Sequence, residues 1–219
     1  MNKLLQMENL ERHYKTPAGV VKALDGVSFE IHEGERIILL GPSGSGKTTL
    51  LNCLSALDSP TSGKYKFLHV EVPRNNSEKM TSFRRQNIGY VFQFFNLLQD
   101  LTVLENVMIG AQKFAKTGLI SASFGRNTKD EADLADRSMA ALERVYAGAL
   151  ANRRANTLSY PDTKRVAIAR ALVSEPTVLM LDEPAGGLGP QDIEWMNGLI
   201  RNLTAHMSVL IVEHHMDVV

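Results

Sequence analysis

The sequence predicts an α/β fold in which a mostly parallel central sheet follows an antiparallel β part and carries an inserted helical subdomain. Compact apolar runs at residues 36–40, 88–92, 177–181 and 209–212 have the length and composition of buried strands. Strands that alternate with helical patterns are typical of a parallel sheet. A largely helical stretch, residues 94–158, separates the second run from the third, and we interpret it as the inserted subdomain.

The remaining elements follow from local patterns. Residues 4–10 and 20–31 have the pattern of short strands joined by turns, and they make up the predicted antiparallel part. The run RIILL at residues 36–40 is expected to be a strand buried on both faces. A Gly-rich loop follows this run, and residues 47–57 are expected to form a helix. Residues 116–129 are rich in Gly, Ser, Thr and Asn, which predicts an exposed loop.

The composition excludes several classes of protein. Lys+Arg and Asp+Glu both number 24, so the formal net charge is zero, which argues against a mainly electrostatic nucleic-acid binder. No uninterrupted apolar run approaches the ~20 residues that a membrane helix needs. Cys53 is the single cysteine, so no intrachain disulfide can form. We therefore expect a soluble cytosolic protein that reaches a membrane only through a partner.

The Gly-rich loop carries the most specific motif in the chain. The segment GPSGSGKT matches the phosphate-binding pattern G-x4-G-K-[ST] and lies between a predicted strand and a predicted helix. Glycines let backbone N–H groups turn toward phosphate oxygens, and the helix N-terminus adds partial positive charge. Lys47 supplies a full charge to the β- and γ-phosphates, and Thr48 offers its hydroxyl to Mg²⁺. The sequence thus predicts a P-loop NTPase core that binds ATP and Mg²⁺. The nucleotide-binding residues predicted here are Gly41, Pro42, Ser43, Gly44, Ser45, Gly46, Lys47, Thr48 and Thr49.

Two acidic residues follow the apolar run at residues 177–181. A strand beside the phosphate loop would place Asp182 near Mg²⁺, together with Thr48. Glu183, one residue further, can face the γ-phosphate and polarise a water molecule as a general base. An apolar run that ends in Asp-Glu is common, and it gains significance here from the phosphate loop.

Further elements occur in the order found in ABC transporter ATPases, and the chain resembles this family from residue 4 to residue 219. Gln93 in YVFQ resembles the Q-loop glutamine. Leu158-Ser159, followed by the helix RVAIARAL, resembles the signature segment. His214 in VEH resembles the switch histidine, and Tyr14 resembles the aromatic residue that stacks on adenine.

The family resemblance implies a role for each of these residues. Gln93 would contact Mg²⁺ or the attacking water and sense the membrane partner, while His214 would contact the γ-phosphate. Two such domains would enclose two ATP molecules, and Ser159 would complete the site of the partner domain. With Glu183, the catalytic candidates are Glu183, His214 and Gln93, and the metal candidates are Thr48, Gln93 and Asp182.

The resemblance also implies a domain organisation and a cellular setting. Residues 1–219 would form a single ABC ATPase domain, with a nucleotide-binding core in residues 1–93 and 159–219 and a helical subdomain in residues 94–158. The partners implied are a transmembrane permease subunit and a second ATPase domain, as a homodimer or a heterodimer. The location implied is cytoplasmic, peripheral on the cytoplasmic face of the inner or plasma membrane. Family members usually continue through further strands, so a full-length chain and a fragment both remain open.

The two halves of the chain resemble different branches of the family. Residues 82–98 are similar to ATPases for lipoprotein release and macrolide export. Residues 116–119, 151–156, 183–188 and 213–217 are similar to ATPases for branched-chain amino acid uptake. One half indicates export and the other import, which leaves the transported substrate open and allows a mosaic or engineered origin.

The chain departs from the family pattern in two segments. The signature usually reads Leu-Ser-Gly-Gly-Gln, whereas here Tyr160, Pro161 and Asp162 follow Ser159. Pro161 has no N–H to offer a phosphate, and Asp162 adds a negative charge. Gly189 stands where the family usually has Asp or Asn. Both segments act across the dimer in the family, whereas the motifs that act within one chain all match.

The main hypothesis is therefore an ATPase subunit that couples hydrolysis to a membrane transporter. The alternative is an ATP-binding regulatory or heterodimer-dependent module with little intrinsic hydrolysis, because the signature segment is degenerate. A third interpretation, a soluble ABC ATPase of DNA repair or translation, is less favoured because those proteins usually carry large insertions or tandem domains.

Overall fold

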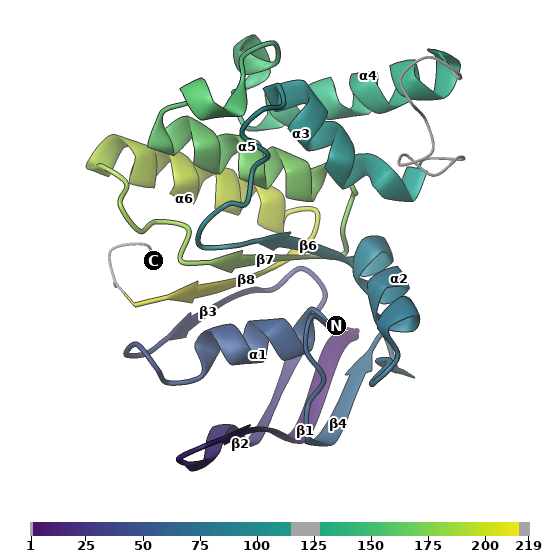
Figure 1. The fold of residues 1–219 in the computed structure, drawn as a ribbon, viewed down its shortest axis with the longest axis vertical. Coiled ribbons are helices and arrows are strands. Elements are labelled where there is room, and N and C mark those ends of the chain that lie inside the picture. The colour runs from purple at the N-terminus through teal and green to yellow at the C-terminus, as the bar shows by residue number, and fades with distance from the viewer. Residues whose placement is uncertain (1, 115–127, 215–219) are drawn as a thin grey trace.

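A computed structural model describes residues 2–114 and 128–214 and places two sheets side by side (Figure 1). The antiparallel sheet has the order β2-β1-β4-β5. Its strands are β1 (Lys3–Thr16), β2 (Gly19–His32), β4 (Ser62–Phe67) and β5 (Val70–Glu71). The long β1–β2 hairpin confirms the predicted antiparallel part, although both strands extend beyond the predicted ranges.

The second sheet is wholly parallel and has the order β3-β8-β7-β6. Its strands are β3 (Arg36–Leu40), β6 (Ile88–Val91), β7 (Val178–Asp182) and β8 (Ser208–Glu213). All residues of the two central strands, β7 and β8, are buried. The parallel sheet confirms the predicted α/β class.

The expectation that residues 36–40 form a strand buried on both faces is wrong for β3. Ile37, Ile38 and Leu39 are only partly buried, and Arg36 and Leu40 are exposed. Within the described residues, β3 stands at the edge of the sheet and pairs only with β8. An apolar run has the same pattern at the edge of a sheet and at its centre, so the sequence does not distinguish the two positions.

Six α-helices complete the described part of the chain. They are α1 (Lys47–Leu54), α2 (Ser77–Asn87), α3 (Val103–Gly110), α4 (Thr128–Arg144), α5 (Tyr160–Leu172) and α6 (Pro190–Thr204). The helix predicted for residues 47–57 ends early as α1, because Ala56 takes a left-handed conformation with φ of 54°. None of the helices in these described residues is long and apolar enough to span a membrane.

The predicted helical stretch contains α3, α4 and short 3₁₀ turns. Thr102 begins α3 with a capping box that includes Glu105. Residues 116–127 of the predicted loop lie outside the described residues, as does the part of the 213–217 match after His214, while Thr128 begins α4. The subdomain boundary at residue 158 stays a prediction, and α5, which follows it, packs against both α3 and α4.

The parallel sheet lies between two hydrophobic cores, because successive residues of a strand point to opposite faces. On β7, Leu179 and Leu181 face the core that includes α3 to α6, whereas Val178 and Met180 face the core formed with α1 and the antiparallel sheet. Figure 1 shows the same layers, with α3 to α6 on one side of the sheet and α1 on the other. Packing on both faces holds the sheet in place. The predicted site residues lie in the segments that leave its carboxyl edge.

Candidate functional site

The predicted site residues gather at one edge of the parallel sheet. Gly41 directly follows β3, Gln93 follows β6, Glu183 follows β7 and His214 follows β8. The carboxyl ends of parallel strands lie at the same edge, which is where ligands bind in open α/β sheets. Four segments that are distant in the sequence thus contribute to one site.

The loop from residue 41 to residue 46 has the geometry of a phosphate cradle. Gly46 begins α1 with φ of 90°, a left-handed conformation that favours glycine. A Cβ atom at Gly46 would lie 2.3 Å from the carbonyl oxygen of Ala23 in β2. Because β2 packs this closely, only glycine fits here, and the loop can present its backbone N–H groups at the start of the helix.

The Lys47 ammonium group lies against this loop. Its Nζ donates to the carbonyl oxygens of Gly41 at 2.7 Å and Pro42 at 2.8 Å. Lys47 is the first residue of α1, so its charge adds to the positive end of the helix. The loop therefore combines a full positive charge with backbone donors, as binding of an oligophosphate requires.

The predicted metal ligands Thr48 and Asp182 are in contact. Thr48 Oγ1 donates to Asp182 Oδ1 at 3.4 Å, and both groups are oxygen ligands of the kind that Mg²⁺ prefers. Asp182 is 5% exposed, and its pKa is raised by burial and by the neighbouring Glu183 carboxylate, although the Thr48 hydrogen bond opposes this rise. A bound cation stabilises a buried carboxylate that lies beside another carboxylate. The Thr48 hydroxyl and the Asp182 carboxylate therefore fit Mg²⁺.

Glu183 is held between the two other predicted catalytic residues. Gln93 Nε2 donates to Glu183 Oε2 at 2.7 Å, and His214 Nδ1 lies 3.2 Å from Glu183 Oε1. The backbone of Glu183 has φ of 51°, an uncommon conformation for a residue with a Cβ atom. Both carboxylate oxygens thus have a fixed neighbour, and the carboxylate is oriented by side chains that follow β6 and β8.

These three side chains line a cavity of about 410 Å³. The cavity is also lined by Tyr160 of α5 and by the segment that follows Glu183. It joins the carboxyl edge of the sheet to the start of α5. The geometry can therefore orient a water molecule at Glu183 next to a phosphate held by the loop.

Comparison with known proteins agrees with this geometry. Residues 24–186 match the family model described as ABC transporter. The high-affinity branched-chain amino acid transport ATP-binding protein LivG of Salmonella typhimurium is 35% identical over 207 residues, which cover 92% of this chain and 79% of LivG. The macrolide export ATP-binding/permease protein MacB of Rhodopirellula baltica is 36% identical over 217 residues, which cover 98% of this chain and 30% of MacB.

Solved structures agree on the fold as well. The dimeric structure of MJ0796, an ABC transporter cassette of Methanocaldococcus jannaschii, has a TM-score of 0.84 at 32% identity and covers 98% of this chain and 90% of its own. A dimeric post-hydrolysis state of MJ0796 bound to ADP and Pi also has a TM-score of 0.84, at 31% identity.

This chain is an ABC transporter ATP-binding cassette. The relatives named above include a branched-chain amino acid transport protein and a macrolide export protein, the two branches that the sequence resembles.

Tyr14 of the cassette lies on β1 and is not among the residues that line the cavity at Glu183. Its hydroxyl donates to Asp58 Oδ2 at 2.8 Å, and the Arg12 guanidinium stacks on its ring at 4.5 Å from the centroid. Arg12 also pairs with Asp58 at 2.8 Å, so the three side chains fix the orientation of the ring. Adenine stacking at Tyr14 stays a prediction, which this fixed ring favours.

Ser159 caps the amino end of α5, and no contact joins it to the phosphate loop of the same chain among the described residues. Its hydroxyl donates to Asp162 Oδ2 at 2.7 Å and accepts from the Asp162 amide at 3.3 Å. Pro161 lies in the first turn of the helix, where it is well tolerated. The unusual signature sequence thus forms a regular helix start, but its serine hydroxyl is bonded to an acidic side chain.

No sequence pattern indicates the side chains that hold the segment after Glu183. Glu213 Oε1 accepts from the Ala185 amide at 2.9 Å. Lys164 Nζ donates to the carbonyl oxygens of Pro184 and Gly186, and the Tyr160 hydroxyl donates to Gly186 at 3.1 Å. These contacts join α5 and β8 to the segment that follows β7, and no local pattern encodes them.

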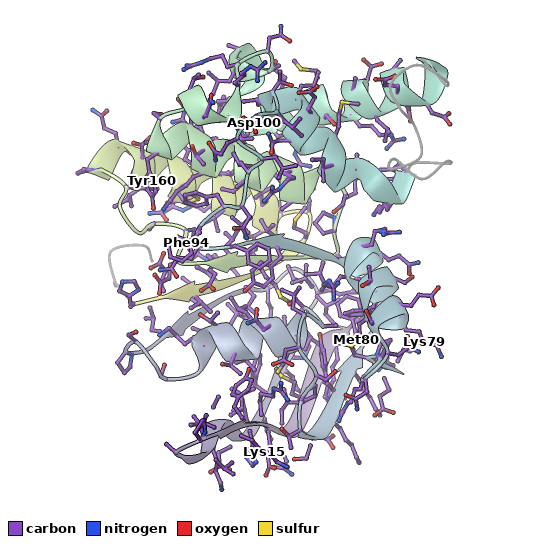
Figure 2. The ribbon with its side chains drawn as sticks, in the orientation of Figure 1. Lys15, Lys79, Met80, Phe94, Asp100 and Tyr160 are labelled. Atoms are coloured by element: carbon purple, nitrogen blue, oxygen red, sulfur yellow. The ribbon has the colours of Figure 1, made fainter. Side chains whose placement is uncertain are left out.

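Replacing Lys47 with Ala is expected to weaken ATP binding by roughly 10- to 150-fold, because hydrogen bonds to charged groups contribute about 1.5–3 kcal/mol. Titration with a fluorescent ATP analogue measures the affinity. Lys79→Ala is the matched control, since Lys79 is exposed on α2, far from the start of α5 at Tyr160 in Figure 2. Equal affinity of parent and Lys47→Ala would refute the assignment.

Proposed function

We propose that this cassette binds Mg-ATP and hydrolyses it, and that it couples hydrolysis to substrate movement through a transmembrane permease. The observation that carries the proposal is the Glu183 carboxylate, held by Gln93 at 2.7 Å and by His214 at 3.2 Å. The Thr48–Asp182 pair and the phosphate loop lie at the same edge of the sheet. The cassette would lie on the cytoplasmic face of the membrane and bind it through the permease.

Each group has a role in the proposed chemistry. The loop amides and Lys47 bind the β- and γ-phosphates of ATP. Glu183 accepts the proton of the attacking water as that water adds to the γ-phosphorus and the bond to ADP breaks. Gln93 and His214 orient Glu183 and face the γ-phosphate. Bound at Thr48 and Asp182, Mg²⁺ would neutralise charge that develops on the phosphates.

The test is ATP turnover measured on the cassette alone and on membranes that contain the cassette with its permease. The genes adjacent to that of the cassette identify the candidate permease. The proposal expects turnover that depends on Mg²⁺ and rises when the permease is present. Equal turnover with and without the permease would refute transport coupling, and lack of ATP binding would refute the site itself.

A second function is favoured by a specific observation at the signature. Pro161 has no N–H, and the Ser159 hydroxyl is engaged by Asp162 at 2.7 Å. A homodimer would present this segment to both nucleotides. We therefore also consider a heterodimer-dependent module with little intrinsic hydrolysis, in which another ATPase domain supplies an intact signature to the phosphate loop of this chain. Turnover that appears only when a second, different cassette is added would favour this function.

A further inference from the structure

Lys164 of α5 is a buried cation that contacts residues 184–187, a segment that we call the hydrolytic loop. The side chain is 1% exposed, and its Nζ donates to the carbonyl oxygens of Pro184 and Gly186. The ammonium group also lies 5.1 Å from the ring centroid of Tyr160 and 5.5 Å from that of Phe95. Two carbonyl groups and two aromatic faces thus form its surroundings.

Burying an ammonium group is unfavourable unless strong hydrogen bonds replace its water. An apolar side chain of similar length would fill the same space without this penalty. The charge at Lys164 is therefore explained by what it binds, the two carbonyl groups on either side of Ala185. The amide of Ala185 itself donates to Glu213 at 2.9 Å, so three consecutive residues of the hydrolytic loop are fixed by side chains.

The hydrolytic loop also fits closely against the start of α5. The Tyr160 hydroxyl donates to the Gly186 carbonyl at 3.1 Å. Gly187 has φ of 72°, and a Cβ atom there would lie 3.1 Å from Tyr160 Cε1. The segment that follows Glu183 is thus attached to the helix that Ser159 caps.

We propose that Lys164 is a positioning residue for Glu183: its ammonium group fixes the hydrolytic loop and ties it to the amino end of α5 in the same chain. The inference rests on the proposed hydrolysis at Glu183 and adds a residue to it. In the proposed dimer, Ser159 at this helix end would face the partner's nucleotide, so Lys164 would connect that helix end to the loop that follows Glu183.

Replacing Lys164 with Met tests the inference through a split between turnover and binding. The variant keeps the buried volume but leaves two carbonyl groups without their donor. Turnover is expected to fall about 10²-fold, because small misplacements of reacting groups lower rates by this order. ATP affinity is expected to stay unchanged. Lys164→Arg keeps the charge and is expected to restore most of the turnover. Lys79→Met, on exposed α2, is the control. Parent-like turnover in Lys164→Met, or an equal loss of ATP affinity, would overturn the inference.

The pH profile provides a second readout, which a merely structural role would not affect. Burial lowers the pKa of Lys164 to about 8, although the carboxylates of Glu213 and Glu183 oppose this shift. The titratable groups that face Lys164 are Glu213 at the end of β8, Glu183 after β7 and Tyr160 on its own helix. As the pH rises through about 8, Lys164 loses its charge, so parent turnover is expected to fall. In Lys164→Arg this alkaline fall is expected to disappear, because arginine stays charged.

Amide NMR tests the hold on the loop without any hydrolysis. In the parent, the amide signals of Ala185 and Gly187 are expected to shift with an apparent pKa of about 8, and the shift should vanish in Lys164→Arg. Signals that do not follow this titration would overturn the inference even if the cassette turns over ATP. If the parent lacks turnover under all conditions, the proposed function fails while the amide titration still decides the role of Lys164.

If Lys164→Met does not fold, Tyr160→Phe removes one hydrogen bond to the same loop and is expected to lower turnover several-fold. Unchanged turnover in this variant would also contradict the inference.

Discussion

Glu183→Gln is expected to slow ATP hydrolysis by roughly 10²–10⁴-fold, the range typical of a lost general base. The amide has the shape of the carboxylate but accepts no proton from water. Its oxygen can still accept from Gln93, and its nitrogen can donate to a neutral His214, so the contacts at 2.7 Å and 3.2 Å have replacements. ATP binding is therefore expected to stay intact, because the phosphate loop is unchanged.

Single-turnover hydrolysis at saturating Mg-ATP measures this loss directly, and a nucleotide titration checks the affinity. Glu175→Gln is the matched control, because the Glu175 side chain is 66% exposed and pairs only with Arg137 on the surface among the described contacts. Such a surface pair contributes little to stability. Hydrolysis by Glu183→Gln at the parent rate would show that another group takes the proton.

The phosphate loop could be predicted because its function demands unusual residues at adjacent positions. Position 46 requires glycine because β2 approaches it closely. Positions 47 and 48 require lysine and threonine because of the ligands that these side chains would bind. Gln93 and His214 could be predicted from their resemblance to family motifs and Glu183 from the strand that precedes it, and each follows a parallel strand at the same edge of the sheet. Sequence patterns therefore locate the ends of these four strands to within one residue.

Other features depend on packing between distant segments and could not be predicted. The sequence of α2 is strongly polar, and Met80 is its only buried residue, so it carries no apolar stripe that would indicate a helix. Lys164 resembles any exposed lysine of a helix until α5 is packed against the hydrolytic loop. The edge position of β3 is likewise a property of the whole sheet and not of its own apolar run.

The structure indicates which residues of the degenerate signature should be replaced to restore its function. A full return to the usual family sequence would replace Tyr160, whose hydroxyl holds Gly186 of the hydrolytic loop at 3.1 Å. Pro161 and Asp162 make no such contact with the hydrolytic loop within the described residues. The informative variant therefore combines Pro161→Gly with Asp162→Gln and keeps Tyr160.

This double variant is expected to raise ATP turnover by about 10²–10³-fold, the usual effect of one charge-assisted hydrogen bond to a developing oxyanion. In the proposed dimer, glycine at position 161 would supply the missing amide to the partner's γ-phosphate. Replacing Asp162 removes a negative charge and releases the Ser159 hydroxyl, which now donates to that carboxylate at 2.7 Å. ATP affinity of the monomer is expected to stay the same, because the phosphate loop is untouched.

Steady-state hydrolysis over a range of protein concentrations checks this result. In the proposed dimer the signature acts on the partner's nucleotide, so the gain is expected to grow with protein concentration. Asp192→Asn is the matched control: Asp192 pairs with Arg165 at 3.2 Å, and Asp162 lies 3.8 Å from the same arginine. A gain in Asp192→Asn would mean that the arginine pairs, and not the signature, limit turnover. If the parent already hydrolyses ATP as fast as the double variant, Pro161 and Asp162 do not impair the site, and the heterodimer-dependent function loses its support.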